Sequence, residues 1–228
     1  MPALGIRRSI ATSTDSSVPV WHGSPNCGPR RDGLTPSLVV VHYTAMRNKQ
    51  VALERLCDPS AEVSAHYLIC TGGTIIQMVE EADRAWHAGA GEWRDMTDIN
   101  SRSIGIELDN AGDHPFPDPQ MRALETLLSG IMSRWSVPPE GIIGHSDMAP
   151  ARKFDPGPRF DWTRLERLGL AAPAQDFAEG DLEAAGFIRA AQKAGFTADV
   201  PFETLLAATR LRRAPWRSGP LQRADFLL

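Results

Sequence analysis

The sequence lacks the features that define several large classes of protein. Its 228 residues contain no apolar run near the roughly 18 residues that cross a bilayer, which argues against a membrane span. Its net charge is −4, so there is no basic surplus to bind nucleic-acid phosphates. The N-terminus has two arginines but no apolar segment of roughly 7–15 residues after them, unlike a secretory signal. We therefore expect no nucleic-acid partner and a cytoplasmic location, or a periplasmic one if the start site is misassigned.

Cysteine is also scarce. The three cysteines, Cys27, Cys57 and Cys70, are odd in number and have no CxxC spacing, which argues against both a disulfide framework and a zinc knuckle. We predict reduced thiols, with a cysteine nucleophile as the weaker alternative because no partner base is implied. The chain has no GxSxG nucleophile elbow either, so a metal-free serine hydrolase has no support.

The sequence does contain strand-like and helix-like segments in alternation. Leu38–Val41 is a continuous aliphatic run, typical of a strand buried on both faces. Residues 103–108 alternate as a strand does, and residues 141–144 form a last short strand. Pro119 begins a helix whose apolar positions follow the 3.6-residue period. This order predicts an α/β or α+β fold, with one sheet flanked by helices.

Composition divides the chain into four parts. Residues 1–35 are rich in Ser, Pro, Gly and Arg and show no period, so we predict an irregular N-terminal arm. Residues 36–168 form the predicted catalytic domain, and residues 169–178 a linker. Residues 179–228 carry helical patterns over Leu182–Ala194 and Phe202–Arg212 and a third short one over Leu221–Phe226, which is enough for a small helical module.

Three side chains are candidate zinc ligands. His42 ends the first core strand, His145 ends the last, and Asp155 lies ten residues further on in a turn rich in proline and glycine. Zinc hydrolases need three such ligands on a rigid frame, with a fourth position open for water. A histidine at a strand end is more often an ordinary hydrogen-bonding residue. Spacing alone therefore does not decide whether these residues bind zinc.

Longer motifs carry more weight than this spacing. They occur in order over residues 24–162: Ser24–Asn26, Val40–Thr44, Val63–Ile69, Arg84–Gly89, Ser103–Leu108, Gly144–Pro150 and Arg152–Pro158. On these segments the chain resembles the zinc-dependent N-acetylmuramoyl-L-alanine amidases of the type-2 amidase family, whose relatives include the peptidoglycan-recognition proteins. The resemblance implies an α/β fold with a mixed central sheet flanked by helices. It also implies that His42, His145 and Asp155 bind one zinc ion per chain.

The resemblance further implies catalytic roles for Glu107 and Lys153. Residues two apart in an extended segment point to the same side, so Lys153 can lie near a metal bound by Asp155 and stabilise a developing oxyanion. Glu107 lies among apolar residues and can carry a proton from water to the leaving amine. A solvated lysine and a carboxylate that only orients a ligand histidine are the alternatives, and Asp109 is the alternative carboxylate.

Three further positions, His66, Trp86 and His87, match the family segments and are predicted to line or brace the cleft. The sequence does not say which of them contact substrate and which only pack. The C-terminal residues resemble a degenerate peptidoglycan-binding module.

The implied activity is hydrolysis of the amide between the lactyl group of N-acetylmuramic acid, or of its anhydro form, and L-alanine of the stem peptide. The expected partners are peptidoglycan fragments or muropeptides. A non-catalytic peptidoglycan-recognition module and a zinc amidase acting on another amide stay open as alternatives. The lack of a signal favours recycled anhydro-muropeptides as substrate, whereas the C-terminal module favours wall material.

Overall fold

The computed structural model describes residues 18–178 and 182–228. The first 17 residues, on which the expectation about a secretory signal largely depends, lie outside the described residues. The predicted start of the helical module, at residues 179–181, lies outside them too. Within the described ranges, no helix has both the length and the apolar character needed to cross a membrane.

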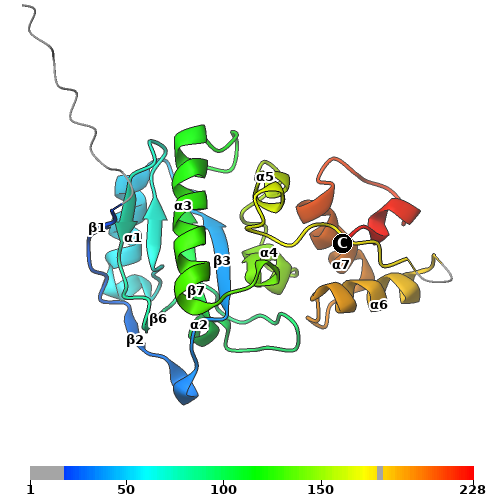
Figure 1. The fold of residues 1–228 in the computed structure, drawn as a ribbon, viewed down its shortest axis with the longest axis horizontal. Coiled ribbons are helices and arrows are strands. Elements are labelled where there is room, and N and C mark those ends of the chain that lie inside the picture. Colours follow the sequence, from blue (N-terminus) through cyan, green and yellow to red (C-terminus); the bar gives the residue numbers. More distant parts are fainter. Residues whose placement is uncertain (1–17, 179–181) are drawn as a thin grey trace, which may run out of the picture.

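A six-stranded mixed sheet forms the centre of the molecule (Figure 1). Across the sheet the order is β1 (Val20–Trp21), β5 (Ile75–Gln77), β4 (Tyr67–Ile69), β7 (Ser103–Leu108), β3 (Leu38–Tyr43) and β8 (Ile142–Gly144). The strands from β4 to β8 in this order are parallel, whereas β5 is antiparallel to β4. A small second sheet pairs β2 (Cys27–Pro29) with β6 (Asp83–Ala85). The predicted α/β fold with a mixed central sheet is confirmed.

Helices flank this sheet. The α-helices are α1 (Lys49–Cys57), α2 (Ile99–Arg102), α3 (Asp118–Trp135), α4 (His145–Met148), α5 (Trp162–Arg167), α6 (Ala184–Ala194) and α7 (Phe202–Arg213). Short 3-10 turns are η1 (Arg31–Gly33), η2 (Pro59–Ala61), η3 (Pro139–Gly141) and η4 (Arg223–Phe226). The longest helix, α3, has Pro119 in its first turn, as the sequence predicts. In Figure 1, α1 and the C-terminal helices α6 and α7 lie at opposite ends of the molecule.

One face of β7 carries apolar side chains, and the other carries small and polar side chains that lie at the candidate site. Successive side chains of a strand point to opposite faces. Ile104, Ile106 and Leu108 are fully buried in the core that α3 covers. The alternate residues, Ser103, Gly105 and Glu107, therefore face the other side of the sheet, where small and polar side chains leave room.

The neighbouring strand β3 is buried on both faces, as predicted. Val39 and Val41 pack in the core under α3, whereas Leu38 and Val40 pack in the core shared with α6 and α7. His42 has the parity of Leu38 and Val40, so it points away from α3. The parallel register pairs His42 with Glu107, which places these two residues side by side on the same face.

Part of the predicted irregular arm is in fact strand. The two residues of β1 pair in parallel with β5 at the edge of the main sheet, and β2 pairs with β6. Strands of two and three residues are too short to produce a hydrophobic period, so the sequence pattern could not reveal them.

The C-terminal helices pack directly against the sheet region. Phe187, Leu205 and Phe226 share one buried cluster with Val40 and Ile143 of the central sheet. The chain end also pairs with residues before α6, because the backbone amides of Gln175 and Leu228 each donate to the other's carbonyl. The helix predicted to begin at Leu182 begins two residues later, at Ala184. The proposed domain boundaries stay predictions.

Candidate metal and catalytic site

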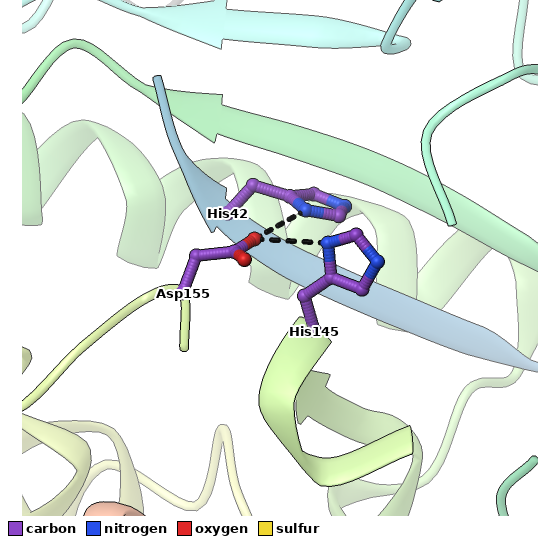
Figure 2. A group of neighbouring side chains, drawn as sticks. All are labelled: His42, His145 and Asp155. Carbon is purple, nitrogen blue, oxygen red and sulfur yellow. Dashed lines mark hydrogen bonds and ion pairs between the residues drawn. The ribbon is translucent and has the colours of Figure 1, made fainter. Parts of the chain in front are cut away.

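The three predicted ligands lie together at one edge of the sheet (Figure 2). His42 lies near the end of β3, His145 is the first residue of α4, and Asp155 lies in the loop that follows. The Asp155 Oδ2 atom is 2.7 Å from His42 Nδ1 and 3.0 Å from His145 Nδ1. All three ligand atoms lie within 4.8 Å of one another. Two ring nitrogens and one carboxylate oxygen thus face a common point.

The parallel sheet explains why residues so distant in sequence meet. β3 and β8 are neighbours with Val41 opposite Gly144, so both strands end at the same edge and deliver the following histidines there. The loop carrying Asp155 is then tied to α4, because the amide of Ser146 donates to the Asp155 carbonyl at 2.9 Å.

A chain of hydrogen bonds holds the second nitrogen of His42. Its Nε2 lies 3.0 Å from His87 Nδ1, and His87 Nε2 lies 3.2 Å from the Ser103 hydroxyl. That hydroxyl donates to the Ile99 carbonyl at 2.6 Å, so it accepts from His87 Nε2–H. His87 Nδ1 is then an acceptor, and His42 donates to it from Nε2. This tautomer leaves His42 Nδ1 as the nitrogen available to a metal.

His145 is oriented in the same way by backbone. Its Nε2 donates to the Ala88 carbonyl at 2.9 Å, which leaves Nδ1 facing Asp155. Arg152 braces this carbonyl, because its guanidinium lies against Gly89 and donates to the carbonyls of Ala88 and Ala90. A Cβ at Gly89 would lie 3.0 Å from that guanidinium, so the small residue permits the approach. Both histidines therefore present Nδ1 to the common point.

The protonation states suit a metal site. Burial lowers the pKa of His42 to about 4, so this imidazole is neutral near pH 7. Burial alone would raise the pKa of Asp155, but the adjacent rings of His145 and His42 hold it well below its usual range. A neutral imidazole and an ionised carboxylate are the forms that bind metal.

Glu107 and Lys153 line the same cavity, which has a volume of about 330 Å³. Burial raises the pKa of Glu107 to about 8, the charge of Asp155 also raises it, and the ammonium of Lys153 opposes both. The Glu107 Oε2 atom is buried and has no hydrogen-bond partner among the described residues. Such an unpaired buried oxygen is rare in proteins and fits a group that awaits a ligand.

The remaining candidates separate into two kinds. His87 and Trp86 line the cavity. His66 does not: it is fully buried, its Nδ1 accepts from the Gly105 amide at 2.9 Å, and its Nε2 lies 3.2 Å from the Asp83 carbonyl.

Asp109, the alternative carboxylate, is not among the cavity residues, and the backbone amides of Thr71 and Lys49 hold it.

Sequence reasoning assigned no role to Ser103, Gly105 or Arg152. A Cβ at Gly105 would lie 2.4 Å from the His87 ring, so only glycine lets this ring reach His42. The available signal was the alternation in Ser103–Leu108, where small or polar residues occupy every second position. Arg152 stands inside a matched motif, but its carbonyl partners lie over 60 residues away in the sequence.

Comparison with known proteins gives an independent view of the chain. The family model described as N-acetylmuramoyl-L-alanine amidase matches residues 32–158. The N-acetylmuramoyl-L-alanine amidase AmiD of Escherichia coli is 39% identical over 151 residues, which cover 59% of this chain and 54% of AmiD. The match thus spans about half of that relative's length. The 1,6-anhydro-N-acetylmuramyl-L-alanine amidase AmpD of Haemophilus influenzae is 35% identical over 159 residues, 62% of this chain and 86% of AmpD.

Solved structures extend the similarity to the C-terminal helices. AmiD from E. coli, solved with anhydro-N-acetylmuramic acid-L-Ala-D-gamma-Glu-L-Lys, matches with a TM-score of 0.74 and 29% identity, over 86% of this chain and 89% of AmiD. AmpDH3 from Pseudomonas aeruginosa matches with a TM-score of 0.75 and 26% identity, over 100% of this chain and 96% of its own. An AmpD structure matches at 0.61 and 31% identity, covering 98% of AmpD but 69% of this chain.

Proposed function

This chain belongs to the N-acetylmuramoyl-L-alanine amidase family, and from that premise we propose that it hydrolyses the lactyl–L-alanine amide of anhydro-muropeptides with one zinc ion. The observation that carries the proposal is the convergence of His42 Nδ1, His145 Nδ1 and Asp155 Oδ2 in the cavity that Glu107 also lines, where its buried Oε2 atom has no hydrogen-bond partner within the described part of the chain. This donor set suits zinc, which favours histidine nitrogen and carboxylate oxygen in hydrolytic sites and leaves a position open.

His42, His145 and Asp155 would hold the ion, with His87 and the Ala88 carbonyl fixing the two imidazole rings. When bound, zinc supplies a Lewis acid that polarises a carbonyl and lowers the pKa of water toward neutrality. The rest of the chemistry falls to two side chains in the same cavity.

Glu107 is suited to move the proton. Its pKa of about 8 lies close to neutral pH, and its Oε2 has no competing hydrogen bond among the described residues. A carboxylate in this state accepts a proton from the attacking water and returns it to the amine of L-alanine as the amide bond breaks. Protonation of that nitrogen is required because an amide anion is a very poor leaving group.

Lys153 is suited to stabilise the oxygen that becomes negative during the attack. It lines the cavity, and its charge acts on the pKa of both His42 and Glu107. A cation at this position interacts more strongly with the tetrahedral oxyanion than with the neutral carbonyl, which lowers the barrier.

The substrate assignment rests on the relatives. AmpD is named for anhydro-muramyl substrates, and AmiD was solved with an anhydro-muramyl tripeptide. The presence of all three ligands together with Glu107 and Lys153 favours an enzyme over the alternative of a non-catalytic recognition module.

Metal analysis and product analysis test the proposal together. Purified protein should hold one zinc ion per chain, and Ala at His42, His145 or Asp155 should remove zinc and activity together. Mass spectrometry should show free tripeptide and anhydro-N-acetylmuramic acid from the soluble muropeptide, with intact sacculi assayed in parallel. Full turnover after complete zinc removal would overturn the metal assignment, and zinc-loaded protein with no product from either substrate would overturn the activity.

A further inference from the structure

One buried arginine of the C-terminal helices reaches the catalytic region. Arg212, near the end of α7, is only 7% exposed. Its guanidinium donates to the Oδ2 atom of Asp147 and, at 3.2 Å, to the Ile142 carbonyl, and it lies 3.8 Å from the centre of a Trp162 ring. Figure 1 shows α7 beside α4, the helix that carries Asp147.

Asp147 connects Arg212 to α4, the helix that begins with His145. It is the third residue of α4 and is 1% exposed. The same Oδ2 atom that accepts from Arg212 also accepts from the backbone amide of Gly144, at 2.8 Å. Gly144 directly precedes His145, so this hydrogen bond caps the turn that presents the histidine.

Helix α4 in turn positions two of the three proposed ligands. His145 is its first residue, and the amide of Ser146 donates to the carbonyl of Asp155. A helix of four residues has no independent stability, since nucleation costs more than one turn returns. Its geometry therefore depends on the contacts at its ends, among which the Asp147 cap is charged and buried.

We propose that Arg212 is a positioning residue for the metal site, acting through Asp147 and Gly144 on His145 and, through Ser146, on Asp155. The inference rests on the proposed zinc site. Without Arg212, the buried Asp147 carboxylate would lose its ion-pair partner, and it would relax toward water and release the cap. An arginine suits this position because its planar group bonds to two oxygens while stacking on Trp162.

The same helix offers a matched control. Arg210 is also buried, at 9% exposed, and forms a two-point ion pair with Asp225 at 2.9 and 2.7 Å. Its other partners, the carbonyls of Gly219 and Pro220, also belong to the C-terminal residues. Loss of Arg210 therefore removes a buried ion pair of α7 without altering any contact to α4, while Asp225 keeps its bond to Arg217.

The experiment compares full-length Arg212→Met with Arg210→Met. Zinc affinity is measured by competition with a chelator, at a temperature where circular dichroism shows both variants folded. Arg212→Met should bind zinc roughly 10- to 100-fold more weakly than wild type, as for other residues that support metal ligands. Arg210→Met should keep wild-type affinity although its melting temperature also falls.

Two further comparisons keep the test decisive. If Arg212→Met does not fold, Arg212→Lys is compared with Arg210→Lys by the same assay, and weaker zinc binding by Arg212→Lys alone supports the inference. Asp147→Asn combined with Arg212→Met should weaken binding no more than the stronger single variant, because both act along one path. Equal zinc affinity in the Arg212 and Arg210 variants would overturn the inference. Wild-type protein that binds no zinc would instead overturn the proposed function.

Discussion

Two carboxylates, Glu107 at the candidate site and Asp225 in the C-terminal residues, differ in how their buried oxygens are hydrogen-bonded. At the site, Glu107 Oε2 is buried with no hydrogen-bond partner among the described residues. In the C-terminal helices, the buried carboxylate of Asp225 accepts from Arg210, Arg217 and the amide of Gln222. An unpaired buried oxygen destabilises a fold, so the state of Glu107 fits a group that binds a ligand, whereas the fully bonded Asp225 stabilises the C-terminal residues. The two regions are nevertheless joined, because Arg212 belongs to one and its partner Asp147 to the other.

The largest effect should come from removing one region entirely. A chain ending at Gln175 would lose the α6 and α7 side of the shared core and leave Asp147 without Arg212. Breaking a buried ion pair alone costs about 3–5 kcal/mol. We therefore expect insoluble protein, or a melting temperature at least about 10 °C lower with activity reduced on soluble muropeptide and sacculi alike. Normal turnover of muropeptide with loss on sacculi only would show that the C-terminal residues act as an independent tether.

Glu107→Gln should have the next largest effect, confined to the site. The amide keeps the shape but cannot accept and return a proton, so kcat should fall roughly 10²-fold or more. Zinc content and melting temperature should stay near wild type. The same assay on Lys153→Met should give a loss of roughly 10²-fold, from the missing oxyanion contact.

Two outcomes would change these roles. Loss of zinc from Glu107→Gln would mean that the carboxylate orients a ligand and does not carry a proton. A normal kcat for Lys153→Met would leave that residue as a solvated lysine.

His87→Ala should have a smaller effect, on metal affinity above all. The substitution removes the acceptor that fixes His42 Nε2, and such support is worth roughly 10- to 100-fold in zinc affinity. Chelator competition measures it. Ser103→Ala, one bond further along the chain, should weaken zinc binding less than His87→Ala. If Ser103→Ala bound zinc more weakly than His87→Ala, the proposed order of the hydrogen-bond chain would be contradicted.

The last prediction concerns how the Asp225 ion pair makes the free energy of unfolding depend on pH. Unfolding is measured with a chelator present, so that metal binding does not contribute. Burial alone would raise the pKa of Asp225, but hydrogen bonds from Arg210, Arg217 and Gln222 lower it to about 2. A lowered pKa contributes stability above the unfolded value near 3.8, and this stability is lost as pH falls toward 2. The difference in unfolding free energy between wild type and Asp225→Asn should shrink by about 2 kcal/mol between pH 5 and pH 2.

A surface pair provides the comparison for that titration. Asp176 forms an exposed ion pair with Arg223, and exposed pairs contribute little to stability. Asp176→Asn should therefore unfold almost like wild type over the same pH range. An equal change in unfolding free energy with pH in Asp225→Asn and Asp176→Asn would show that burial of Asp225 does not decide how much its ion pair stabilises the fold.

Much of the fold and of the candidate site follows from local sequence patterns. The aliphatic run before His42, the alternation around Glu107 and the period of α3 predict the elements that the structure contains. The short strands β1 and β2 escaped prediction because they depend on pairing partners and not on a pattern of their own. For the same reason the sequence could not separate His87, whose Nδ1 contacts His42, from His66, whose ring nitrogens contact backbone groups and Arg30.

By itself, then, the sequence determined the strands that end at the site and the ligand candidates carried on them, because residue periods and motifs are local properties. Only the tertiary structure decided which nitrogen of each histidine faces Asp155, and that α7 supports α4. The first outcome depends on His87 and the Ala88 carbonyl, and the second on the contacts of Arg212 with Asp147 and Ile142, which lie 65 and 70 residues earlier in the chain. A partner at such a distance is selected by packing and by the cost of burying an unpaired charge, and neither is visible in a local pattern.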